Sequence, residues 1–187
     1  MNTEQRTTGN DAFDIKNDYV IINNRRILFR EQSIIDGKLH MTMPSDLKKM
    51  PVEPIAAEFS DEAMPDVFFM NAQETMTMFF SFREEMIDNE SIKEATNILL
   101  QDFFESNPSF EFISSTVFDA AGTAVGCFDL SSYSDDIEIY SLMFIFPFEG
   151  RLVFGSFNYS CENMTGWDDV AKQMISSINI VDNRASN

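Results

Sequence analysis

Pairs of adjacent phenylalanines constrain the fold of this chain more than any other feature of the sequence. Phe68 stands next to Phe69, and Phe79 next to Phe80, in segments with the composition of β-strands. Successive side chains of a strand point to opposite faces of its sheet, so both faces of this sheet must be covered. The chain has 19 phenylalanines and 12 methionines to build such a core. We therefore predict a sheet with a covering layer on each side.

Alternation of apolar and polar residues predicts that the sheet is antiparallel. Met76, Met78 and Phe80 share one face of their strand, and the last four predicted strands alternate β-branched and aromatic residues in the same way. Turn residues such as asparagine and glycine separate several of the segments. The predicted strands cover residues 19–22, 27–29, 39–43, 67–70, 75–82, 110–119, 123–132, 137–146 and 152–159.

Two helices are expected to cover the sheet. The first spans residues 91–105, where Ser91 and Glu94 have the spacing of a capping box and apolar residues recur at helical intervals. The second is capped by Thr165 and turns Trp167 and the apolar residues as far as Ile178 inward. A run of strands with two separated helices indicates an α+β domain, mainly an antiparallel β-sheet flanked by helices.

The connection at residues 44–66 contains four of the six prolines. Proline interrupts helices, so we expect at most short helical turns here, near residues 46–50 and 56–59, in a segment that wraps the edge of the sheet.

The length of 187 residues fits a single domain, which we place at residues 19–182. Residues 1–18 are predicted to be a flexible polar tail and residues 183–187 a short C-terminal tail. The N-terminal segment lacks the apolar run of a signal peptide, and no stretch approaches the roughly 18 apolar residues of a membrane helix. A cytoplasmic location is therefore expected.

Acidic residues dominate the charge of the chain. The formal net charge is -18, from 31 acids and 13 bases. Residues 1–50 hold 8 bases and 7 acids, which leaves 5 bases and 24 acids in residues 51–187. This excess disfavours nucleic acid and anionic membranes as partners and would attract a basic protein.

The order of these elements resembles the PsbP-like α/β/α sandwich superfamily. The likeness is carried by the opening strand and proline at 35–44, the strands at 67–71 and 75–80, the hairpin at 140–159 and the closing helix at 167–178. That superfamily includes a photosystem extrinsic subunit, a Ran-binding import factor, and bacterial DcrB-type and EagR-type proteins, the last being chaperones for apolar toxin segments. The resemblance implies a non-enzymatic binding scaffold of the DcrB/EagR type and transfers no functional residue.

Few residues support catalysis. His40 is the only histidine, and it is predicted to lie on the strand face opposite Leu39 and Met41. Cys127 and Cys161 have no neighbouring histidine, so we expect no zinc site, and whether the two thiols meet is left open. No metal or other cofactor is expected, because the paired acids lack the spacing of a calcium-binding loop.

We predict a protein-binding module that acts as a chaperone, an adaptor or a toxin-neutralising partner. Its partner is expected to be a protein that is basic or exposes an apolar segment, with a homodimer as the alternative assembly. The binding surface is predicted to combine the part of one apolar sheet face that stays open as a groove with nearby acids. Its residues are Met70, Met76, Met78, Phe80, Met143, Asp135, Asp136 and Glu138.

Two other functional classes are left open. One is a small hydrolase or lyase, which requires an enclosed pocket lined by two or more of Asp129, Asp135, Asp136 and Glu138. The other is a structural subunit of a larger assembly.

Overall fold

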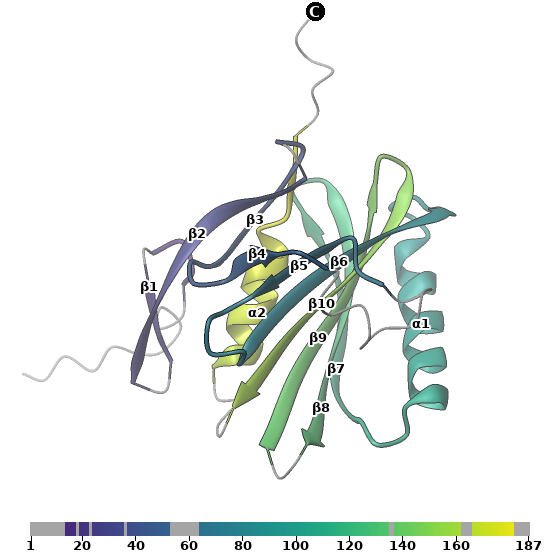
Figure 1. Ribbon diagram of the computed structural model, residues 1–187. Coiled ribbons are helices and arrows are strands. Elements are labelled where there is room, and N and C mark those ends of the chain that lie inside the picture. Colours follow the sequence, from purple (N-terminus) through teal and green to yellow (C-terminus); the bar gives the residue numbers. More distant parts are fainter. Residues whose placement is uncertain are drawn as a thin grey trace, which may run out of the picture.

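The computed structural model describes residues 14–17, 19–22, 24–35, 37–52, 64–134, 137–161 and 166–181, which form two sheets and two helices (Figure 1). The helices are α1 (Ile92–Ser106) and α2 (Trp167–Ser176). The strands are β1 (Tyr19–Ile22), β2 (Arg25–Ile35), β3 (Leu39–Pro44), β4 (Lys48–Met50), β5 (Val67–Met70), β6 (Met76–Met86), β7 (Glu111–Ala120), β8 (Thr123–Ser134), β9 (Ile137–Phe148), β10 (Arg151–Cys161) and β11 (Asn179–Ile180).

The main sheet has seven strands in the order β4-β5-β6-β10-β9-β8-β7. All of its pairings are antiparallel, and the register places Gly155 beside both Phe144 and Phe80. A Cβ atom on Gly155 would collide with the Phe144 ring, so glycine is required for these rings to pack over the centre of the sheet. The predicted class, an α+β domain built mainly on an antiparallel sheet, is confirmed.

Helix α1 covers one face of the main sheet, at β8 and β9. A Cβ atom on Gly126 would collide with the Thr96 hydroxyl, so the missing side chain lets the helix approach the strand. Phe128 packs on the same side, with its ring 6.1 Å from that of Phe103. This side is called the α1 face below.

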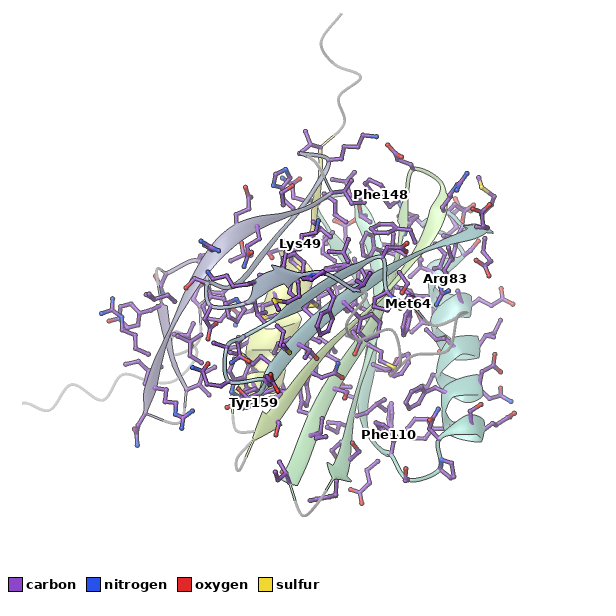
Figure 2. The ribbon with its side chains drawn as sticks, viewed as in Figure 1. Lys49, Met64, Arg83, Phe110, Phe148 and Tyr159 are labelled. Atoms are coloured by element: carbon purple, nitrogen blue, oxygen red, sulfur yellow. The ribbon has the colours of Figure 1, made fainter. Side chains whose placement is uncertain are left out.

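Helix α2 and a second, four-stranded sheet cover the opposite side, called the α2 face (Figure 1). The small sheet has the order β1-β2-β3-β11, so β3 pairs with a strand that lies near the C-terminus. The Ser177 hydroxyl accepts a hydrogen bond of 2.8 Å from the Thr42 amide and so joins β3 to the end of α2. Figure 2 shows the side chains that fill the space between the layers, with Phe148 near the β9–β10 turn and Tyr159 towards the other end of β10.

The paired phenylalanines occupy both faces, as the alternation predicts. Phe69 and Phe80 lie in the core under α2, whereas Phe68 is buried and Phe79 half-buried on the α1 face. Phe79 contacts the ring of Phe154 there, at 5.9 Å.

Several local predictions require correction. Residues 48–50 form strand β4 instead of a helical turn, because their backbone pairs with β5; the turn predicted at 56–59 lies outside the described residues. Ser91 precedes α1 without capping it, since its hydroxyl donates to Asp88 at 2.7 Å. The N-cap of α2 is Gly166 in a left-handed conformation (φ 87°), and Thr165 is not described.

The ordered core also begins earlier than predicted. Ile15, placed in the predicted tail, is buried, and its amide donates to the Gln173 side chain of α2 at 3.1 Å. The other residues of the two predicted tails lie outside the described ranges, apart from Asp14, Lys16 and Asn17. No helix among the described residues is long and apolar enough to cross a membrane.

Candidate functional site

The predicted contact residues lie in different environments. Met76, Met78 and Phe80 belong to the core beneath α2, and Met78 and Phe80 have no exposed surface. The small sheet and α2 close over this face, so these three side chains cannot form the open apolar groove that the sequence suggested. Met70 and Met143 are half-buried on the α1 face. Glu138 is half-buried near the start of β9, and Asp135 and Asp136 lie outside the described residues.

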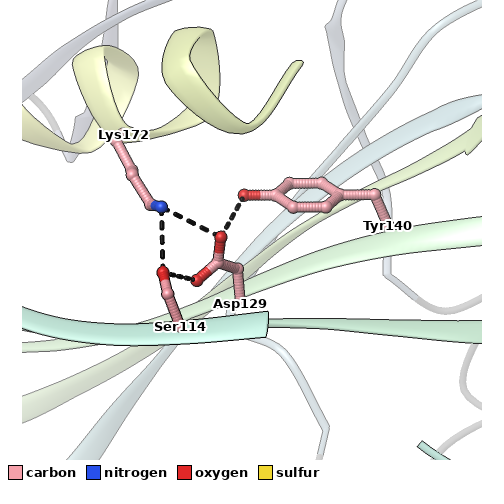
Figure 3. A network of polar contacts seen from close by, with 4 residues as sticks. All are labelled: Ser114, Asp129, Tyr140 and Lys172. Atoms are coloured by element: carbon pink, nitrogen blue, oxygen red, sulfur yellow. Dashed lines mark hydrogen bonds and ion pairs between the residues drawn. The ribbon is translucent and has the colours of Figure 1, made fainter. Parts of the chain in front are cut away.

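A buried polar network joins α2 to the end of the main sheet (Figure 3). Asp129 on β8 is completely buried, and its carboxylate lies 3.0 Å from the Lys172 ammonium of α2. The Ser114 hydroxyl of β7 donates to the same carboxylate and accepts a hydrogen bond of 3.0 Å from Lys172. The Tyr140 hydroxyl of β9 donates at 3.5 Å. The network therefore ties three strands to one helix.

The acidity of two neighbouring groups reflects this environment. Burial, followed by the negative charge of Asp129, raises the pKa of the Cys127 thiol to about 12. The same two causes raise the pKa of Tyr140 well above its usual value near 10. Both groups therefore remain protonated at neutral pH, and the Cys127 thiol is a poor nucleophile.

The network has the properties of a structural ion pair. The Ser114 hydroxyl donates its proton to Asp129 and accepts from Lys172, so Lys172 is not placed to take that proton as a base would. Both oxygens of Asp129 are occupied by donors. The arrangement satisfies a buried charge, and it does not resemble a nucleophile with its base.

The carboxylate pocket of the hydrolase alternative is not found among the described residues. Glu138 pairs with Tyr133, four positions along β8 from Asp129, which corresponds to about 13 Å along the strand. Neither of the two cavities described below is lined by these acids. No three His, Cys, Asp or Glu side chains of the described part of the chain are grouped closely enough to hold a metal ion.

Strand β7 offers a different kind of site, because it forms one edge of the main sheet. Seven of its ten residues are exposed, including Phe112 (52%), Ile113 (40%) and Val117 (40%). The pairing with β8 shifts between Phe112 and Ser114, so Ile113 forms a bulge and residues 114–120 make a regular run. An edge strand exposes unpaired backbone N–H and C=O groups that another strand can bond.

The opposite edge of the sheet is protected. Strand β4 has only three residues, two of them Lys48 and Lys49, and Pro51 follows. Short length, lysine and proline are common protections against strand pairing. Strand β7 has neither lysine nor proline in ten residues, so the two edges differ in their capacity to accept another strand.

Aromatic side chains extend from the core to the β7 edge. The ring of Phe128 lies 6.1 Å from Phe103, which is 5.9 Å from Phe104, which in turn is 6.2 Å from Phe112. Phe110 also packs against Phe103, beside the lower part of α1 in Figure 2. Phe112 is therefore held by other rings on one side while half of its surface remains available for contact.

A cavity of about 450 Å³ lies between the two sheets at the start of α2. Trp167 and Tyr159 lie on its wall with their rings 4.3 Å apart, and Arg25 and Arg26 are exposed. The Trp167 Nε1 is buried and has no hydrogen-bond acceptor among the described residues. A second cavity of about 640 Å³ adjoins the first at Ser45, Asp46 and Asn71 and includes Met70. Asn71 is buried and lines both cavities, but its side-chain amide is bonded within the β5–β6 turn, where it donates to the Thr75 hydroxyl and accepts from the Met76 amide.

Comparisons with known proteins identify the fold. No protein-family model matches the sequence, and no curated protein matches it in sequence. Among solved structures, the cyanobacterial PsbP (CyanoP) of Synechocystis sp. PCC 6803 matches with a TM-score of 0.54 and 14% identity, over 82% of this chain and 92% of that one. The Saccharomyces cerevisiae Ran-binding protein Mog1p matches with a TM-score of 0.53 and 11% identity, over 83% and 97%.

The chain has the PsbP-like α/β/α sandwich fold, as the sequence resemblance predicted. At these identities the likeness concerns the fold alone, and the narrower resemblance to DcrB-type and EagR-type members stays a prediction.

Sequence reasoning did not find the β7 edge or the partner of Asp129. The edge depends on the order of strands in the sheet, which no local pattern contains. The only sequence signal was the absence of lysine and proline from residues 110–119. Lys172 lies 43 positions from Asp129 in the chain, and no motif connects them.

Proposed function

We propose that this protein is a protein-binding module that accepts an extended segment of another protein along β7. The observation that carries the proposal is the unprotected edge, a regular run at residues 114–120 with exposed Val117 in its middle. Addition of a strand supplies main-chain hydrogen bonds, while side-chain contacts supply specificity. The half-exposed ring of Phe112 adds an apolar contact beside the edge.

This mode of binding suits an adaptor, a chaperone for an unfolded segment or a toxin-neutralising partner, all of which act by stoichiometric contact. The fold supports the proposal in so far as one protein that shares it is described as Ran-binding. We place the protein in the cytoplasm, in keeping with its composition.

The test compares two lysine substitutions of exposed apolar residues. Val117→Lys puts a charge on the β7 edge, and Ile98→Lys makes the same change on the outward side of α1, where Ile98 is 54% exposed. Each variant and the original protein would be used to capture proteins from lysate of the source cells, with thermal unfolding to verify folding. Capture lost with Val117→Lys and kept with Ile98→Lys is the expected result. Equal capture by all three proteins would refute binding at β7.

A further inference from the structure

The charges around β7 indicate which kind of segment occupies the edge. Glu111 and Asp119 stand near its two ends and are both exposed. Between residues 111 and 134, the β7–β8 hairpin contains no lysine, arginine or histidine. Its third acid, Asp129, is buried and neutralised by Lys172. Two exposed negative charges therefore flank a neutral run of serine, threonine, valine and phenylalanine.

We infer that the occupant of β7 is an extended segment of another protein, with a neutral, β-branched centre and a basic residue at each end. The inference rests on the proposed function and adds the chemistry of the partner. Because of the bulge at Ile113, Glu111 and Asp119 lie opposite residues seven positions apart on β8 and point to opposite faces of the sheet, so a matching strand carries its two basic residues seven positions, or about 23 Å, apart. Opposite charges facing each other across a strand pair are favourable, and like charges are unfavourable.

A second copy of this chain fits the edge less well. It would bring the same flanking acids to the interface and a net charge of -18 towards an equal charge. The serine, threonine and valine side chains of β7 contain no feature that pairs specifically with an identical strand. A basic segment gains from the same electrostatic field that opposes self-association.

The experiment uses the full-length protein and three synthetic peptides of about eight residues with alternating threonine and valine, whose two end side chains point to opposite faces as Glu111 and Asp119 do. The peptides differ only in their two end residues, which are lysine, glutamine or glutamate. Amide hydrogen exchange of β7 measures where each peptide binds, and calorimetry at low and high salt measures its affinity. We expect protection of residues 114–120 and about tenfold tighter binding of the lysine peptide than of the glutamate peptide at low salt, with the difference falling as salt is added.

Paired variants test the role of the two acids. Glu111→Gln/Asp119→Asn is expected to bring the three affinities within about twofold of one another. The matched control Glu74→Gln/Glu85→Gln removes two exposed acids at the two ends of β6, which lies four strands from β7, and should keep the preference for lysine.

The outcomes separate the two proposals. Equal binding of all three peptides at β7 would refute the charge inference and leave strand addition intact. If no peptide protects β7, both the occupant and its mode of binding are wrong. A dimer in sedimentation that Val117→Lys dissociates would show that a second copy occupies the edge, which also overturns the inference.

Discussion

The two partners of the buried ion pair are expected to differ in their importance for stability. Asp129 has 1% of its side chain exposed, whereas Lys172 has 31%. Replacing Lys172 by methionine leaves a carboxylate without its cation in the core. Replacing Asp129 by asparagine leaves an ammonium that can turn towards water. Lys172→Met should therefore lower the free energy of unfolding more than Asp129→Asn does.

The contacts of Asp129 and Lys172 give the expected destabilisation for each substitution. Breaking a buried ion pair by removing one partner costs about 3–5 kcal/mol, and we place Lys172→Met near 3 kcal/mol because the Ser114 and Tyr140 hydroxyls still donate to the carboxylate. Asp129→Asn should cost about 1 kcal/mol, the value of a hydrogen bond exchanged for one to water. The double variant should resemble Asp129→Asn alone, which gives a coupling energy of about 3 kcal/mol in magnitude.

Urea unfolding at neutral pH tests this expectation. Trp167 is the only tryptophan and is buried against Tyr159, so its fluorescence reports loss of the α2 packing directly. Lys172→Arg serves as the conservative control, since it keeps the cation. The reasoning would be refuted if Asp129→Asn lowered the free energy of unfolding as much as Lys172→Met or more. It would also be refuted if the loss in the double variant equalled the sum of the two single losses.

Further predictions concern packing and protonation. Gly126→Ala should destabilise the protein by about 2 kcal/mol in urea unfolding, because the new methyl group meets Thr96, and Thr96→Ala should recover part of the loss; no recovery would place the clash elsewhere. Stability should fall above about pH 9, where the unfolded chain ionises Cys127 and then Tyr140 while the folded protein keeps both protons, with a slope of about 1.4 kcal/mol per pH unit for each group. Cys127→Ala/Tyr140→Phe should flatten the curve between pH 9 and about 11, and an unchanged curve would assign the alkaline loss to other residues. In a Cys161→Ser background, a thiol reagent should modify Cys127 only as fast as the protein opens, so fast labelling of the native protein would contradict its burial.

Much of the architecture follows from local patterns. The spacing of Ile92, Ala95 and Leu99 predicts α1 because apolar side chains at three- and four-residue intervals form one face of a helix. Alternation predicts the long strands in the same way, and the hairpins follow because their strands are neighbours in the chain. Strand β4 was missed because nearby prolines obscured a short segment that forms a strand by pairing with β5.

The sequence by itself determined that both faces of an antiparallel sheet are buried, since adjacent phenylalanines in a strand cannot share a face. It also determined the excess of acid. Only the tertiary structure decided which strand became the exposed edge, which methionines entered the core, and that Lys172 neutralises Asp129. Each of these depends on pairing between distant segments, such as β3 with β11, and the free energy of that pairing comes from the whole core instead of from any local run of residues.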